Sequence, residues 1–266
     1  MNARRIYAIV LRQLYLLRDN PTRTFQLFVW VTVDLVIWGF ITKYLSSVVP
    51  PTFGVVTFFL GAVILWGFLL RVMQGMTTSF LEDVWSKNFL NLFASPLKIA
   101  EYISGLVATS ILTSSVVIAG VLLLAYVAFG FSFFALGLKI IPFLFILFLF
   151  GIALGIFGVA IVLRIGPSAE WLVWPIPALL NPFVGVFYPV TTLPPWMQWV
   201  SHALPPSYVF EGMRAAILSG QLSLRPLAAA FILAIFYIAA SYFFFGMTYR
   251  TVVRKGLIAR FEAEGP

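Results

Sequence analysis

Long apolar runs dominate the chain, and several are long enough to cross a bilayer. A membrane-spanning helix needs about 20 predominantly apolar residues. Six windows of the sequence meet this requirement, at residues 25–45, 55–79, 103–129, 140–163, 171–190 and 226–249. The pattern predicts an all-α membrane protein with six transmembrane helices, in which residues 21–266 form one transmembrane domain.

The fifth window differs from the others because four prolines interrupt it: Pro175, Pro177, Pro182 and Pro189. Proline removes a helical hydrogen bond and its ring clashes with the preceding turn. We therefore expect this segment to be kinked or broken, with its freed backbone groups facing protein rather than lipid.

Residues 1–20 have an amphipathic pattern of their own. Apolar residues recur at helical spacing and arginines supply the polar side: Ile6, Val10, Leu14 and Leu17 against Arg4, Arg5, Arg12 and Arg18. Asn20-Pro21 ends the pattern. We expect a basic amphipathic helix that lies in the headgroup region. The alternative is that it extends the first span into the cytoplasm.

The distribution of basic residues predicts the orientation. Cytoplasmic connections of membrane proteins are enriched in Lys and Arg. With both termini in the cytoplasm, most basic residues fall inside: Arg4, Arg5, Arg12, Arg18, Arg23, Lys87, Lys98, Arg164, Arg250, Arg254, Lys255 and Arg260. Only Lys43, Lys139, Arg214 and Arg225 fall outside. The net charge of +8 is therefore an orientation signal, and we expect no nucleic-acid partner.

Composition narrows the function. The chain is 62% hydrophobic and 10% charged, with no cysteine and one histidine, which excludes a disulfide framework and a Cys/His metal cluster. The sequence contains no G-x-x-x-x-G-K-[ST] nucleotide-binding loop and no hydrolase signature. We expect no enzyme activity and no cofactor or metal in this chain. A transporter subunit, an ion-coupled carrier and a membrane scaffold remain.

A short charged stretch, EDVWSKNFLNLFASPLK, separates the second and third windows at residues 82–98. As a helix it would place Asp83, Lys87 and Asn91 on one face and apolar residues on the other, and Pro96 would end it. One interpretation is an interfacial helix that merely joins two spans. The other is a rigid lever that a second protein can push.

Two motifs resemble those of the ABC-2 exporter permeases. The first is the acidic start, short helix and Ser95-Pro96-Leu97 of this stretch. The second lies on the outer side, where LPPWMQ (193–198) and LPPSY (204–208) precede Glu211 and Arg214. Pro205-Pro206 stands where many of these permeases have Asn-Pro.

The resemblance implies a transmembrane subunit in the cytoplasmic membrane of a prokaryote, paired with a separate cytoplasmic ATPase that holds ATP and Mg. It implies two ATPase chains and two permeases, the second permease being another copy of this chain or a close paralogue, with membrane lipid around them. Residues 82–95 would form the coupling helix, with Glu82, Asp83, Trp85, Lys87, Phe89, Leu92, Phe93 and Pro96. Residues 191–220 would form a re-entrant outer segment, with Trp196, Trp199, Tyr208, Glu211 and Arg214 as an outer gate. The residues themselves predict two short helices here, at 195–203 and 207–218, each starting beside a proline. The alternative for the aromatic residues is an ordinary belt at the membrane interface.

The substrate class follows from the resemblance as well. The motifs are most similar to the multidrug branch, which implies export of an amphipathic small molecule or a lipid-like substrate. Lipid-linked polysaccharide is the alternative within the same architecture. An ion-coupled secondary carrier is less favoured, because Asp34 is the only acid deep within a span.

Asp34 and Arg71 are the two charges inside the first and second windows. The short connection between these spans makes them antiparallel neighbours, and both charges lie at a similar depth from the cytoplasmic side. Because an isolated charge in a bilayer is costly, we expect an intramembrane ion pair. It could be structural, or it could line the inner pathway.

Overall fold

The computed structural model of the chain is all-helical. It describes residues 2–48, 55–86, 88, 91–92, 95–131, 140–220 and 223–256, except for the side chains of 23, 26, 27, 55–57 and 167, and no strand occurs among them. The all-α prediction is confirmed. Lys87, Phe89 and Phe93 of the predicted coupling helix lie outside the described residues.

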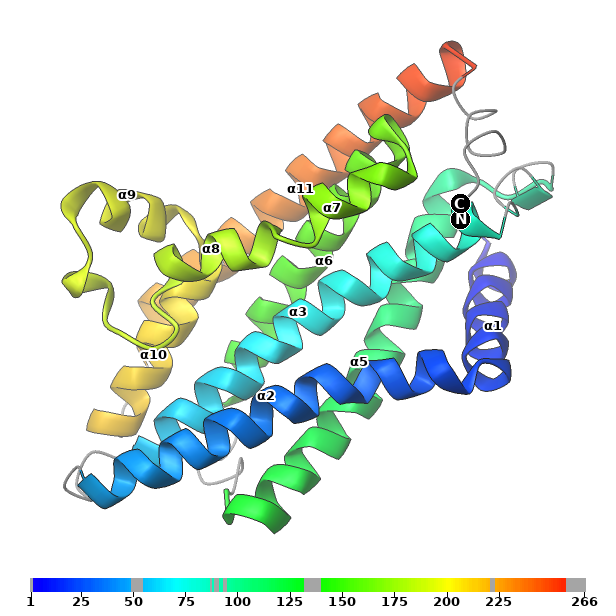
Figure 1. Cartoon of the computed structure of the whole chain (residues 1–266). Coiled ribbons are helices and arrows are strands. Elements are labelled where there is room, and N and C mark those ends of the chain that lie inside the picture. Colours follow the sequence, from blue (N-terminus) through cyan, green and yellow to red (C-terminus); the bar gives the residue numbers. More distant parts are fainter. Residues whose placement is uncertain are drawn as a thin grey trace.

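Five long helices form the body of the structure (Figure 1). They are α2 (Pro21–Val48), α3 (Val55–Trp85), α5 (Ile99–Phe129), α6 (Ile140–Ile165) and α11 (Leu224–Arg254). Within the part that the structure describes, these five are long and apolar enough to cross a membrane. Burial separates them: the most apolar window is 78% buried in α6 and 67% in α3, against 17–22% in the other three. The central α3–α6 pair is therefore covered by helices whose outer faces remain apolar and exposed.

Glycines allow α6 to lie close to α3. A Cβ atom at Gly151 would lie 2.9 Å from Cβ of Val72, and one at Gly155 would lie 2.8 Å from Sδ of Met76. Small residues permit this close approach where lipid supplies no hydrophobic driving force between helices.

The proline-interrupted fifth window is broken, as predicted. The window and its flanking residues form a single turn at Pro167–Ala169 (η3), then α7 (Glu170–Val173), α8 (Ile176–Val184) and another turn at Val190–Thr192 (η4). Pro175 separates α7 from α8, and Gly185 ends α8 with a left-handed φ of 68°. No element in this segment is long enough to span as a continuous helix.

The remaining helices lie at opposite ends of the molecule (Figure 1). Helix α1 (Ala3–Asp19) packs on α5 at the end where α3 and α11 terminate. Helices α9 (Pro195–Ala203) and α10 (Pro205–Ser219) lie at the end where α2 terminates. The two short outer helices predicted beside prolines are thus present, and each begins at a proline.

Candidate functional site

A buried polar junction joins α1, α3 and α5. Asp83, in the last turn of α3, forms an ion pair with Arg12 of α1, and its second oxygen accepts a hydrogen bond from the Tyr102 hydroxyl of α5 at 2.7 Å. The side chains of Asp83 and Tyr102 are fully buried. Burial lowers the pKa of the Arg12 guanidinium, but the hydrogen bond and charge of Asp83 outweigh this and raise it above its ordinary value. Arg12 therefore stays charged and holds α1 in place.

A second set of contacts fixes the start of α1 to the start of α5. The Glu101 carboxylate accepts hydrogen bonds from the backbone N–H groups of Asn2 (2.8 Å) and Lys98 (3.1 Å), and from Arg5 (3.2 Å). Nearby, α1 and α5 are in close contact, because a Cβ atom at Gly105 would lie 2.6 Å from the Ile9 side chain. Helix α1 is therefore docked on protein along one side, with Tyr7 and Tyr15 exposed on another.

The predicted coupling segment is divided by the structure. Glu82 to Trp85 form the end of α3 and do not begin a new helix. Asp83, which the sequence placed on an exposed polar face, is buried in the α1–α3–α5 junction because Arg12 and Tyr102 bind it. Leu92 is helical and packs against the core, and Ser95-Pro96 forms an exposed turn.

A cavity of about 800 Å³ lies beside this junction, between the α1–α2 corner, α3, α5 and α7. Polar residues of α3 line it at helical spacing, namely Arg71, Gln74, Thr78 and Glu82. Three tryptophans and a second acid complete much of its wall: Trp30, Trp85, Trp174 and Glu170. This inner cavity combines a large volume with aromatic and charged walls, in a chain that is otherwise strongly apolar.

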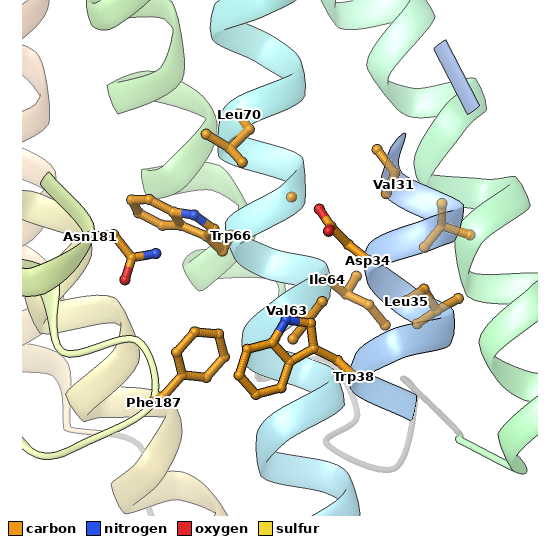
Figure 2. Close-up of a pocket in the computed structure, with 12 residues that line it drawn as sticks. Val31, Asp34, Leu35, Trp38, Val63, Ile64, Trp66, Leu70, Asn181 and Phe187 are labelled. Atoms are coloured by element: carbon orange, nitrogen blue, oxygen red, sulfur yellow. The ribbon is translucent and has the colours of Figure 1, made fainter. Parts of the chain in front are cut away.

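A smaller pocket of about 260 Å³ lies between α2, α3 and the loop after α8. Figure 2 shows the Asp34 carboxylate directed from α2 across this pocket toward Trp66, with Asn181 on the far side. Trp38 and Phe187 stack with their ring centroids 4.3 Å apart. Among the described residues that line this Asp34 pocket, none is basic.

Asp34 and Arg71 are not brought together. They line different cavities, and no ion pair joins them among the described residues. Both residues lie near the middle of their helices, but their side chains face different cavities. Gly67 and Leu70 face the Asp34 pocket, whereas Arg71 faces the inner cavity.

The predicted outer-gate residues bind the loop after α8. Glu211 accepts hydrogen bonds from the Val190 backbone N–H and from Arg214, both at 2.7 Å. Arg214 also donates to the Gly185 carbonyl at 3.0 Å, and its guanidinium lies 4.8 Å from the centre of the Phe58 ring. These contacts hold both ends of the loop that carries Phe187 into the Asp34 pocket.

The aromatic members of the predicted gate lie nearer the surface. Trp196 contacts Phe183 edge to face at 6.1 Å, and Trp199 is 81% exposed. The Tyr208 hydroxyl donates to the His202 carbonyl at 2.8 Å and so links α10 to α9. The structure thus brings Glu211 and Arg214 together and leaves Trp199 apart from them.

Sequence reasoning missed Arg12 and Tyr102 at the junction and the acid–tryptophan wall of the inner cavity. The cavity had a signal: Arg71, Gln74, Thr78 and Glu82 repeat at intervals of three and four within an apolar run, which indicates a polar helix face. The junction had a weaker signal in the sequence, which is the glutamine Gln13 on the face of α1 that also carries Ile9 and Val10. A buried glutamine indicates a face packed on protein rather than on lipid.

Comparison with known proteins gives one family. The model of the ABC-2 type transporter family matches residues 5–218, which include α1, four of the five long helices and α10 almost to its end. No curated protein matches the chain.

Proposed function

This chain belongs to the ABC-2 type transporter family, and from that premise we propose that it is the permease subunit of an ATP-driven exporter. The family match across most of the chain is the observation that carries the proposal. Members of this family are transport subunits, and ATP hydrolysis belongs to a separate subunit. The described helices agree with a multi-pass membrane protein.

The chain crosses the membrane six times, with both termini in the cytoplasm. Five crossings are the long helices, and the broken η3–α7–α8–η4 segment makes the sixth. Two observations support this. Helix α1 and the end of α11 lie at the same end of the molecule (Figure 1), which requires an even number of crossings. The connections at that end also hold most of the basic residues.

Cysteine labelling tests this topology, because the natural chain has no cysteine. A cysteine in place of Ser46 or Gln198 should react with an impermeant thiol reagent added to intact cells. One in place of Ser86 or Ser95, at exposed positions of the other end, should react only after the cells are opened. Labelling of Ser86→Cys in intact cells would overturn the orientation.

A second permease copy covers the outer stripe of α2. Trp30, Ile37 and Phe40 are exposed on this helix, and so is Asp34. A carboxylate that faced lipid near the centre of a span would cost at least about 2.5 kcal/mol. A homodimer with two ATPase chains, in the cytoplasmic membrane of a prokaryote, would place this stripe against protein or a water-filled path.

The exported substrate is an amphipathic small molecule or a lipid-like molecule. The inner cavity supports this proposal because its volume is within the range of pockets that hold drug-sized ligands, about 300–1,000 Å³, and its walls are both aromatic and polar. It lies beside the end of α3 that leads into the coupling segment at 82–95. A movement of that segment by the ATPase would therefore act directly on the cavity wall.

Co-expression with candidate ATPase subunits tests the function. The permease should co-purify with its ATPase, and the complex should hydrolyse ATP in a vanadate-sensitive way. Phe89→Asp and Leu92→Asp should each abolish co-purification, because a charged carboxylate buried in a protein groove without a partner costs several kcal/mol. Trp199→Asp, at the opposite end of the molecule, is the matched control and should bind the ATPase normally.

Undiminished co-purification with both coupling variants would contradict the assignment of residues 82–95. Size-exclusion profiles of the variants, compared with the profile of the natural chain, would show whether each is folded. This matters most for Leu92, which packs against the core.

A further inference from the structure

We propose that the Asp34 pocket binds the positively charged group of an amphipathic organic cation, and that the inner cavity holds the rest of that molecule. This inference rests on the proposed function, because it names the substrate class of the same pathway. The inference is carried by the side chains that line the two cavities, and by the lack of a basic residue among the described residues that line the Asp34 pocket.

The charge of the Asp34 pocket selects for a cation. Among the described residues that line it, Asp34 is the one with a charge, and no hydrogen bond or ion pair from another of them satisfies its carboxylate. The acids Asp83, Glu101 and Glu211 differ, because each is bound by an arginine. A carboxylate at this depth, in a largely apolar pocket, repels an anion and gains most from a positively charged ligand.

The walls of the pocket select for an organic cation over a metal ion. A hard inorganic cation needs several oxygen ligands, whereas this pocket offers the Asp34 carboxylate and the Asn181 amide among aromatic and aliphatic side chains. Trp38, Trp66 and Phe187 present aromatic surface around the acid (Figure 2). An ammonium or similar group beside tryptophan is attracted by the negative face of the ring.

The inner cavity repeats the same chemistry on a larger scale. Trp30, Trp85 and Trp174 line it together with Glu82 and Glu170, and Arg71 is the one basic residue in the described part of its lining. The two cavities follow one another along α2 and α3, since Trp30 and Asp34 are one helical turn apart, and Leu70 and Arg71 are neighbours. A volume of about 260 Å³ suits a charged head with one ring, and about 800 Å³ suits a whole amphipathic molecule.

The same arrangement discriminates against the substrates of an anionic class. A phosphate or pyrophosphate group, such as a lipid-linked sugar carries, would meet Asp34 in a pocket whose lining, as far as the structure describes it, contains no basic residue. The proposal therefore favours cationic over anionic amphipathic substrates, a distinction that the sequence motifs could not make.

Equilibrium binding to the full-length permease, purified without ATPase, tests the proposal. The probe is tritiated tetraphenylphosphonium, a permanently charged organic cation, measured by scintillation proximity on bead-bound protein. The natural chain should bind it saturably. Unlabelled benzyltrimethylammonium should displace the label, and an equal excess of benzylsulfonate should not.

Variants locate the site. Asp34→Asn, which keeps the shape and removes the charge, should weaken binding about tenfold or more. Asp34→Glu should stay within about threefold, because the charge remains. Asp19→Asn, an exposed acid outside both cavities, is the control and should bind like the natural chain.

The proposal is overturned if the natural chain shows no saturable binding, if benzylsulfonate competes as well as benzyltrimethylammonium, or if Asp34→Asn binds undiminished. A melting temperature of Asp34→Asn equal to that of the natural chain would show that lost binding is not lost folding. If Asp34→Asn is unstable, the proposal is judged on two other results. Asp34→Glu should retain binding, and benzyltrimethylammonium should compete with the label whereas benzylsulfonate should not. Since no ATPase is present, failure here leaves the ATPase co-purification test of the exporter function standing, and the reverse also holds.

Discussion

Two acids of this chain, Asp83 and Asp34, lie in opposite settings. Asp83 is fully buried where α1, α3 and α5 meet, and both of its oxygens are bound, by Arg12 and by Tyr102. Asp34 lies on the less buried α2, in a pocket whose described lining residues supply aromatic rings and no basic group. A charge whose partners are all present within the chain holds structure, whereas a charge that the chain leaves unsatisfied is available to a ligand.

The same contrast extends to the elements that surround these two acids. Around Asp83, the junction joins α1, α3 and α5 at the end that leads to the coupling segment. Arg5, Glu101 and the backbone of Asn2 fix α1 to α5 a second time. The Asp34 pocket is closed partly by a loop, whose Phe187 is positioned by contacts from α10. We expect the junction to move as a unit and the pocket to change shape.

The largest expected effect comes from Asp83→Ala. This change leaves the Arg12 guanidinium and the buried Tyr102 hydroxyl without their acceptor, so the free energy of unfolding should fall by about 3–5 kcal/mol. Denaturant titration in mixed micelles would measure it. The triple variant Arg12→Met, Asp83→Leu, Tyr102→Phe should recover much of the loss, because apolar groups of similar size can replace a buried ion pair. A loss below about 0.5 kcal/mol in Asp83→Ala would refute the structural role.

Asp34→Asn should act in the opposite direction on stability. Removing a charge that has no partner in its span should leave the free energy of unfolding unchanged or raise it by up to about 2 kcal/mol, while transport of a cationic substrate is lost. The charge swap Asp34→Arg with Arg71→Asp should not restore transport or yield, because the two side chains face different cavities. Recovery by the swap would show that they pair in the folded protein.

Tyr102→Phe is a finer probe of the junction. It removes the 2.7 Å hydrogen bond to Asp83 and keeps the ring packed between α3 and α5. Hydrogen bonds to charged groups contribute about 1.5–3 kcal/mol, and because Arg12 still binds Asp83 we expect a loss near 1.5 kcal/mol. Tyr126→Phe, an exposed tyrosine further along α5, is the matched control. Equal stability of the two variants would mean that Arg12 alone satisfies Asp83.

Much of the fold could be predicted from the sequence, because apolar length and proline position are local properties. The five long helices, the end of α1 at Asn20, the break beside Pro175 and the short helices at Pro195 and Pro205 all follow from nearby residues. The positions of Asp34 and Arg71 well inside their helices could also be predicted, because both lie within long apolar runs.

The sites were less predictable, because they depend on how helices are rotated against one another. Arg71 lies at the expected height but turns toward the inner cavity, and Asp83 turns inward to Arg12 because α3 continues through Trp85. A helix that ended near Ser79 would have freed Asp83 for a new surface helix. The resemblance named Glu211 and Arg214 as outer-gate residues, but their contacts with Val190 and Gly185 depend on how the loop after α8 packs against α10.

The smallest expected effect tests whether those outer contacts reach the Asp34 pocket. Arg214→Lys keeps the charge but cannot bind Glu211 and the Gly185 carbonyl in the same planar geometry. We expect a loss of about 1 kcal/mol in the free energy of unfolding. We also expect a two- to fivefold weaker tetraphenylphosphonium affinity, because Phe187 would be held less firmly against Trp38. The control is Arg225→Lys, an exposed arginine at the start of α11, which should change neither quantity. A loss of stability in Arg214→Lys without any change in affinity would show that the loop stabilises the outer end alone, and that the Asp34 pocket is formed by α2 and α3.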